Sequence, residues 1–375
     1  LDHTLLDTVR GPTKSLASNL SSAESTVSYF NSFDSNGFTL NGGNQPVNGL
    51  NETHVGWTWD AGANSSKTYT VKVVSDSGNK YRFDDFGSSA VTLELEEGST
   101  YVFDQSDSSN GAGGTHPLRF STTSDGTHNS GSEYTTGVTV TGTPGQAGAK
   151  TTITVASGAP TLYYYCSNHS GMGGQANTNS TAGASNLDGT IQTTVRANAS
   201  TGFSIVSYTG NATQGATIGH GLNAVPEFML VKRRDSSSYG VAYHKYIDAT
   251  APEDYFVRLF ASATDGIKAR TNSSGAWFDT APTSSVFTVS NALVTNGSSA
   301  TYIAYIWAPV SGYSSFGSWT GNGSTDGPFI FTGMRPALVL WKRTDAADNW
   351  AIVDNARSTF NVADDWLGPN LDSAE

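Results

Sequence analysis

Cysteine, histidine and methionine occur together in one short segment, at a spacing that can bind a metal ion. The segment reads Tyr163-Tyr164-Tyr165-Cys166-Ser167-Asn168-His169-Ser170-Gly171-Met172, and Cys166 is the one cysteine of the chain. A second histidine, His116, lies well upstream of this segment. A thiolate and two imidazoles form a trigonal site that suits copper, and a thioether can serve as a weak axial ligand. His116, Cys166, His169 and Met172 are therefore the predicted metal ligands.

Alternating apolar and polar residues recur along the chain and predict β-strands. Strands are therefore the elements that must position these ligands. Glu97-Gly98 and Asp125-Gly126 supply turn signals between such segments. One short helix is also predicted, over residues 13–23. The predicted strands include Tyr69–Val73, Val91–Glu96, Thr151–Val155 and the aromatic run that leads into Cys166.

The composition agrees with an all-β protein made of sandwich domains. Of 375 residues, 41 are glycine, 14% are charged and 11% are aromatic. Many short strands with turns about every 8–12 residues are typical of β-sandwiches. The net charge of −12 argues against binding to nucleic acid, which attracts basic surfaces. No apolar run approaches the roughly 18 residues of a membrane helix, so membrane insertion is not expected.

Two segments repeat each other at a nearly constant offset along the chain. Tyr208–Asn211 and Pro226–Asp235 match Trp319–Asn322 and Pro336–Asp345. The second half of this module, in which a Phe-Thr strand precedes an aromatic strand ending at Trp307, recurs near the N-terminus. There, Phe38-Thr39-Leu40 leads to His54–Trp59. The period has the length of a whole domain, which is too long for a solenoid, and therefore predicts tandem domains.

The repeats predict the domain boundaries. Residues 1–62 are the C-terminal part of a repeated β-sandwich module, 66–178 a different domain, 179–199 a linker, 200–310 a complete module and 315–375 the N-terminal part of a further module. The end motif Asn19–Glu24 recurs as Asn370–Glu375. We therefore expect the chain to be part of a larger repetitive protein.

Residues 66–178 resemble the cupredoxin family of small blue copper proteins. The resemblance rests on the aromatic strand before Cys166, on the Cys166, His169 and Met172 spacing, and on the upstream His116. It implies a β-sandwich of about eight strands with these four residues as copper ligands. Many family members have proline where this chain has Asn168, and the neighbouring His128 is a competing ligand. The domain can also keep this fold without copper and serve as a spacer.

Other candidate sites have simpler interpretations. The cluster Asp104, Asp107 and Asn110 offers oxygen ligands for calcium, but an Asx-rich turn is favoured because the spacing is not that of an EF-hand. His220 is expected in a turn. Core packing is preferred over sugar stacking for Trp277, Trp319, Trp341 and Trp350. The chain lacks the common hydrolase, metalloprotease and phosphate-loop motifs, so we expect no enzyme.

The repeated module, from Tyr208 to Trp307-Ala308, is similar to modules in structural tail proteins of marine phages, notably those of cyanobacteria. The resemblance implies a non-enzymatic component of a virion tail or tail fibre, with a role in attachment to the host surface. Expected partners are other virion or filament subunits in a homo-oligomer, and a host-surface glycan or protein. Two alternatives remain: an extracellular copper-binding or electron-transfer protein with a type 1 copper site, and a filament-forming surface protein.

Overall fold

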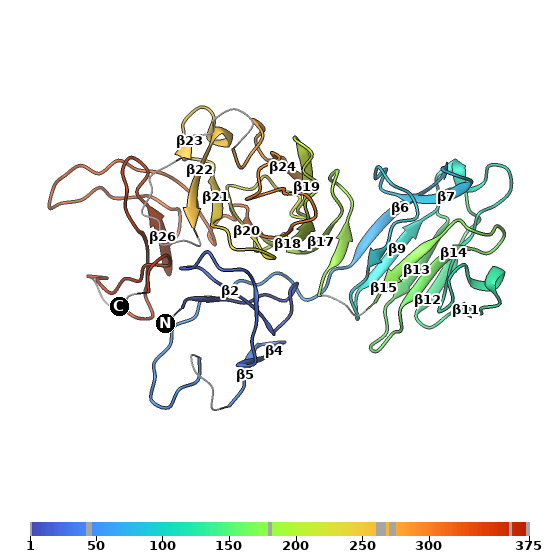
Figure 1. Cartoon of the computed structure of the whole chain (residues 1–375), viewed down its shortest axis with the longest axis horizontal. Helices are drawn as coiled ribbons and strands as arrows, with labels where there is room; N and C mark the ends of the chain where they lie inside the picture. The colour runs from blue at the N-terminus through green and yellow to red at the C-terminus, as the bar shows by residue number, and fades with distance from the viewer. Residues whose placement is uncertain are drawn as a thin grey trace. The chain divides into compact units, whose positions relative to one another are not determined.

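A computed structural model describes residues 2–42, 47–178, 182–259, 268–269, 275–359 and 362–372. The chain divides into two compact units, which we call unit 1 (residues 1–61 and 197–375) and unit 2 (residues 62–196). Nearly all regular structure in the described residues is β-strand, and the helices there are three short 3-10 turns (Figure 1). The all-β prediction is therefore confirmed.

Unit 2 contains two five-stranded sheets. In the first sheet the order is β12-β13-β9-β6-β7, and in the second it is β11-β10-β14-β15-β8. The strands are β6 (Lys67–Ser75), β7 (Asn79–Phe83), β8 (Leu93–Glu94), β9 (Thr100–Asp104), β10 (Leu118–Ser121), β11 (Glu133–Tyr134), β12 (Val138–Thr141), β13 (Lys150–Thr154), β14 (Leu162–Cys166) and β15 (Gly174–Asn177).

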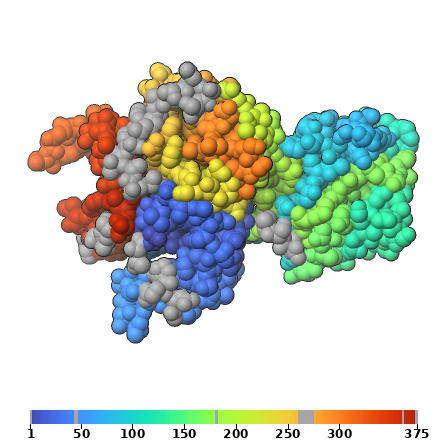
Figure 2. Space-filling model, viewed as in Figure 1, coloured from blue at the N-terminus to red at the C-terminus, as the bar shows by residue number. Residues whose placement is uncertain are grey.

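An aromatic core joins the two sheets of unit 2. The Phe103 ring in the first sheet lies 5.4 Å from Phe120 in the second, and Phe83 lies 5.1 Å from Tyr164 in the same way. All four side chains are buried because residues on one face of each strand alternate toward the partner sheet. The residues of unit 2, cyan to green, form a densely packed body in Figure 2. This core gives a rigid frame for the loops at its ends.

Unit 1 is built on a sheet with the strand order β18-β25-β20-β21-β22-β23. A second, two-stranded layer of β19 and β24 contributes Phe287, whose ring lies 6.5 Å from Tyr208 of β18. The strands are β18 (Phe203–Thr209), β19 (Ala216–Gly219), β20 (Phe228–Arg233), β21 (Gly240–His244), β22 (Tyr255–Leu259), β23 (Lys268–Ala269), β24 (Val286–Val289) and β25 (Thr301–Trp307).

The remaining strands of unit 1 belong to the two ends of the chain. They form a three-stranded sheet and two hairpins, and one core contains Val9 and Leu16 together with Phe228, Tyr305 and Trp350. The N-terminal segment therefore packs against the complete module. The strands are β1 (Thr4–Leu5), β2 (Lys14–Ala17), β3 (Ser25–Thr26), β4 (Phe30–Asp34), β5 (Gly37–Leu40), β26 (Leu338–Lys342) and β27 (Trp350–Asp354).

Two expectations about local structure are wrong. The helix predicted over residues 13–23 is strand β2, because pairing with β1 and β3 overrides the weak helical pattern. The predicted linker 179–199 holds β16 (Ala184–Asn186) and β17 (Thr193–Asn198), and Ala184 and Leu187 join the core of unit 2. Burial of these apolar side chains outweighs the polar composition of the segment. Residues 179–181 lie outside the described residues.

No helix in the described part of the chain is long and apolar enough to cross a membrane.

Candidate metal centre

Antiparallel pairing of β10 with β14 brings the predicted ligands together. In this pairing Leu118 lies opposite Cys166, so His116, which precedes β10, lies beside the loop that follows β14. The Ser167 amide donates a hydrogen bond to the Pro117 carbonyl at 3.0 Å and continues the pairing past the end of both strands. Cys166 closes β14, and His169 follows three residues later. Residues far apart in the sequence thus face one another at one end of the sandwich.

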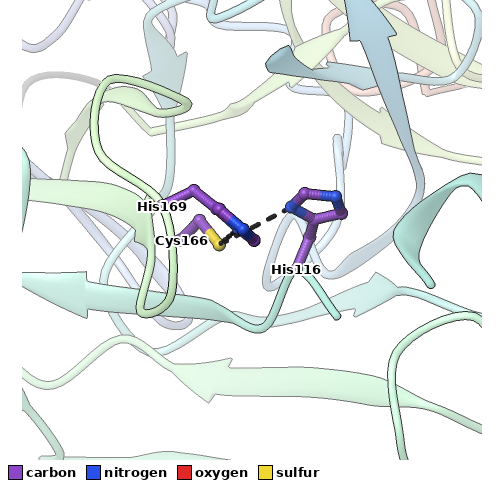
Figure 3. A group of neighbouring side chains, drawn as sticks. All are labelled: His116, Cys166 and His169. Atoms are coloured by element: carbon purple, nitrogen blue, oxygen red, sulfur yellow. Dashed lines mark hydrogen bonds between the residues drawn. The ribbon is translucent and has the colours of Figure 1, made fainter. Parts of the chain in front are cut away.

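The thiol and the two imidazole rings converge on one point (Figure 3). The Cys166 Sγ lies 3.6 Å from His169 Nδ1 and 3.9 Å from His116 Nδ1, and the ligand atoms all lie within 4.8 Å of one another. The two imidazole ring centroids are 4.5 Å apart. Within the described residues, this is the one cluster of three or more histidine, cysteine or acidic side chains that can hold a metal ion. Sequence spacing predicted all three members.

The hydrogen bonding of His116 leaves the correct nitrogen available to a metal. Its Nε2 lies 3.1 Å from the Ala112 carbonyl, which can only accept, so Nε2 carries the proton and Nδ1 presents its lone pair to Cys166. Burial lowers the pKa of His116 and repulsion from His169 lowers it further, whereas the hydrogen bond to the Ala112 carbonyl acts in the opposite direction. The ring is therefore held in the neutral form that ligates metals.

Buried polar side chains hold the backbone of His116, and sequence reasoning missed their role. The His116 carbonyl accepts hydrogen bonds from the Tyr81 hydroxyl at 2.8 Å and from Gln105 Nε2 at 2.7 Å. The His116 amide donates to the Asn110 carbonyl at 2.8 Å. Tyr81, Gln105 and Asn110 are all buried, and burial raises the pKa of Tyr81 well above its usual value. Because these hydrogen bonds satisfy both the amide and the carbonyl of His116, the backbone of this residue is held rigidly before any ion binds.

The ligand loop is tied down from two sides. Asn168 Nδ2 donates to the Thr115 carbonyl at 2.9 Å and lies 3.1 Å from the Thr115 hydroxyl, so it joins the loop of Cys166 to the segment of His116. Gly173 follows Met172 and lies so close to β14 that a Cβ atom there would be 1.7 Å from the Tyr164 carbonyl oxygen. Only glycine allows the backbone to come this close to β14. The spacing of the ligands in the sequence gives no sign that residue 173 must be glycine.

The four predicted ligands differ in exposure. His116, Cys166 and Met172 are each at most 1% exposed, whereas His169 is half-buried. Met172 belongs to the same buried cluster as Cys166. Three ligands thus lie inside the domain, and one imidazole reaches the surface.

The competing histidine lies outside the cluster. His128 Nε2 donates to the Cys166 carbonyl at 2.9 Å and therefore supports the strand end rather than joining the three side chains.

The calcium alternative is also resolved in favour of a turn. The Asp107 carboxylate caps the 3-10 turn Ser108–Asn110 by accepting from the Ser109 backbone amide. The side-chain Nδ2 of Asn110 donates to the Val71 carbonyl.

The remaining candidates take structural positions or stay exposed. His220 lies buried at the end of β19, where Nδ1 accepts from the Leu222 amide, as a turn role requires. Trp277 and Trp350 are buried, which confirms the core interpretation. Trp319 is 49% exposed, so the prediction that it packs in a core is wrong. Trp341 is half-buried in β26.

The donor set fits a first-row transition metal. Ligand bonds of about 2.0 Å to nitrogen and about 2.3 Å to sulfur, set at about 120°, place the two donor atoms about 3.7 Å apart. The two Sγ to Nδ1 distances, 3.6 and 3.9 Å, bracket this value. The distances from the thiol to each imidazole nitrogen are therefore compatible with an ion bound between them.

Comparisons with known proteins bear on the rest of the chain. No curated protein and no solved structure matches it. The family model described as a domain of unknown function, DUF7483, matches residues 1–83 and 167–375. The unmatched residues 84–166 lie within unit 2 and contain His116 and Cys166, so the match leaves out two of the three clustered residues. Since the match covers well over half of the chain, the chain belongs to the DUF7483 family.

Proposed function

We propose that unit 2 binds one copper ion through His116, Cys166 and His169, with Met172 as the weak axial ligand. The observation that carries this proposal is the convergence of one thiol and two imidazole nitrogens within 4.8 Å at the end of a rigid sandwich. Two histidines, one cysteine and a methionine are the donor set of electron-transfer copper sites. The cupredoxin-like arrangement proposed from the sequence is compatible with the two packed sheets of this unit.

The residues of this chain favour copper over zinc. Structural zinc sites are closed by four cysteine or histidine ligands, and no fourth such side chain joins the cluster in the described residues. A buried thioether is a soft ligand, which suits copper. Rigid support of His116 by Tyr81 and Gln105 holds one geometry in both oxidation states, which keeps the reorganisation on electron transfer small.

When bound, copper supplies one-electron redox chemistry. The chain's own residues control access to it: Cys166 and His116 are shielded from water by the core, whereas His169 is half-buried. The surface edge of His169 is therefore the route by which a redox partner would exchange electrons with the site.

Copper titration of the purified full chain tests the proposal. We expect binding of one copper(II) ion per chain and an intense visible absorption from charge transfer between the Cys166 thiolate and copper. Metal analysis after dialysis gives the stoichiometry, and electron paramagnetic resonance gives the ligand set. A sample that stays colourless with copper(II), or that retains only zinc, would overturn the copper assignment.

Asn168 offers a milder test of how the loop is positioned. Asn168→Ala removes both contacts to Thr115, so we expect copper affinity to fall about 10–100-fold, as for other residues that orient ligands. Ser167→Ala, at the neighbouring position, removes only the donation from its hydroxyl to Asn168 Oδ1 at 3.4 Å, keeps both contacts of Asn168 Nδ2 with Thr115, and should bind copper as the parent chain does. Competition with a copper chelator measures both affinities. Equal affinities in the two variants would contradict a positioning role.

A second candidate function concerns unit 1: we infer that it serves as a non-enzymatic structural component, in a virion tail or fibre. The specific observation in favour is that the β20–β21 and β26–β27 hairpins pair in the same register at equivalent positions of the repeat, since Phe228 lies opposite His244 and Leu338 opposite Asp354. Repetition of one module lengthens a scaffold and multiplies weak contacts with a host surface. Mass spectrometry of purified virus particles is the test, because a particle component copurifies with the capsid at fixed stoichiometry. A protein lost on gradient purification would contradict this function.

A further inference from the structure

A short turn of unit 2 joins the half-buried imidazole of His169 to the buried thioether of Met172. The turn consists of Ser170 and Gly171, and Gly171 has a left-handed φ of 73°. Glycine adopts this conformation without steric cost, so the backbone can turn sharply between the two proposed ligands. The position of Met172 relative to His169 therefore depends on what holds this turn.

A carboxylate holds the turn on one side. The Ser170 hydroxyl donates a hydrogen bond to Asp125 Oδ2 at 2.6 Å, and the Gly171 amide donates to Asp125 Oδ1 at 2.9 Å. Asp125 lies in the connection between β10 and β11 of the second sheet. Both oxygens of one carboxylate thus bind consecutive residues of the turn. Hydrogen bonds to an ionised acceptor are about twice as strong as those between neutral groups.

Asp125 is itself fixed by a close approach of the backbone to β14. It precedes the 3-10 turn Gly126–Asn129, and a Cβ atom at Gly126 would lie 2.5 Å from the ring of Tyr165. Tyr165 is buried and directly precedes Cys166. The strand that carries Cys166 therefore also determines where the Asp125 carboxylate lies.

Strand β7 of the first sheet holds the same turn from another side. Lys80 Nζ donates to the Gly171 carbonyl, and the Tyr81 amide donates to the Met172 carbonyl at 2.9 Å. The Tyr81 hydroxyl also supports His116, so β7 contacts both parts of the site. Gly171 thus has a carboxylate bound to its N–H and an ammonium group bound to its carbonyl.

We propose that Asp125 and Lys80 form a clamp on Gly171, which fixes Met172 relative to His169 before a metal binds, and that their opposite charges set the preference for copper(II) over copper(I). The inference rests on the proposed copper function and identifies residues that control it. Copper(II) carries one more positive charge than copper(I), so the Asp125 carboxylate favours the oxidised ion and the Lys80 ammonium favours the reduced ion. Both side chains are half-buried, so water screens part of each charge.

Hydrogen exchange of the metal-free full chain tests the clamp without copper. Asp125 has a left-handed φ of 59°, which glycine tolerates, so Asp125→Gly removes both contacts without backbone strain. We expect the Gly171 amide to exchange about 10–100-fold faster, the range for a lost hydrogen bond to a charged group. Ser130→Gly is the matched control, because Ser130 has the same φ at the other end of the 3-10 turn and the change keeps both Asp125 contacts. Equal exchange in the two variants would overturn the clamp.

Copper affinity connects the clamp to the metal site. Asp125→Gly should bind copper(II) about 10–100-fold more weakly than the parent, whereas Ser130→Gly should bind as the parent does. Two failures can be told apart. A parent chain that takes up no copper overturns the proposed function and the charge effect with it, and amide exchange then decides the clamp. A parent that binds copper no better than Asp125→Gly overturns the clamp alone.

The reduction potential of the copper-loaded protein separates the charge effect from structural support. Asp125→Asn keeps an acceptor oxygen and a residue type that tolerates the left-handed region, but it removes the negative charge. It should lower the ratio of copper(II) affinity to copper(I) affinity about 2–10-fold, and Lys80→Met should raise this ratio by a similar factor. Loss of support alone would move the potential in the same direction in both variants, because each would only loosen Met172. Shifts of the same sign, or no shift in either variant, would overturn the charge effect.

Discussion

Replacing Cys166 by serine should abolish the visible colour of the copper-loaded protein and reduce copper affinity by more than about 100-fold, the upper range for residues that only orient ligands. The hydroxyl of serine cannot supply the thiolate that gives the intense charge-transfer absorption. Serine is close to cysteine in size, and His116 Nδ1 and His169 Nδ1 lie near enough to pair with its hydroxyl. The fold of unit 2 should therefore survive the substitution.

Thermal unfolding gives an independent readout of the same variant. Saturating copper at about 100 times the dissociation constant stabilises the parent by about 2.7 kcal/mol, because it binds only the folded state. The Cys166→Ser variant should show no such shift. His128→Gln is the matched control: His128 lies outside the cluster, and glutamine can still donate to the Cys166 carbonyl, so colour and shift should stay intact. Retention of the colour in Cys166→Ser would place the copper site elsewhere in the chain.

Replacing Arg10 by methionine should destabilise unit 1 by about 3–5 kcal/mol, the cost of leaving a buried charge without its partner. Arg10 forms a buried ion pair with Asp7, and its Nη2 donates to the Tyr305 hydroxyl at 2.9 Å. Tyr305 in turn donates to Asp7 at 2.7 Å. Burial alone would lower the pKa of Arg10, but Tyr305, Asp7 and Glu24 hold it above its ordinary value.

Tryptophan fluorescence isolates this effect, because all eight tryptophans lie in unit 1 and none in unit 2. Urea unfolding followed by this signal therefore reports on unit 1 alone. Arg343→Met is the control: its pair with Asp345 is exposed at 54% and 77%, and exposed pairs of this kind contribute little to stability. The double variant Asp7→Leu and Arg10→Met should recover much of the loss, because no charge remains buried. Equal midpoints for Arg10→Met and Arg343→Met would show that residues 1–24 are not integral to unit 1.

The sequence supported correct predictions wherever the signal was local. Alternation identified β6 and β13, and the Cys-x-x-His spacing placed Cys166 and His169 on one loop. The repeated sequence predicted two related modules, and in the structure the β20–β21 and β26–β27 hairpins of those modules match in register residue for residue. Local hydrogen bonding and side-chain alternation are encoded within short segments, so a single sequence displays them.

Predictions that depended on partners distant in the chain were less secure. Residues 13–23 carry a weak helical pattern, yet β1 and β3 draw Lys14–Ala17 into a sheet. The support of His116 by Tyr81, Gln105 and Asn110 has no sequence signature, because a buried tyrosine or glutamine side chain can donate to any carbonyl in reach and the Asn110 backbone carbonyl accepts as that of any residue can. The Arg10, Asp7 and Tyr305 group joins side chains from near the two ends of the chain.

By itself, the amino-acid sequence determined that this protein is built from strands, that one sequence module recurs, and which side chains can bind a metal ion. The tertiary structure alone decided that His116 meets Cys166 with its Nδ1 directed at the thiol, and that His128 does not join them. The physical reason is that residue type and spacing set the chemistry a segment can offer. Which groups become buried, paired or left exposed depends on how distant segments pack, because burial and hydrogen bonding are properties of the assembled core.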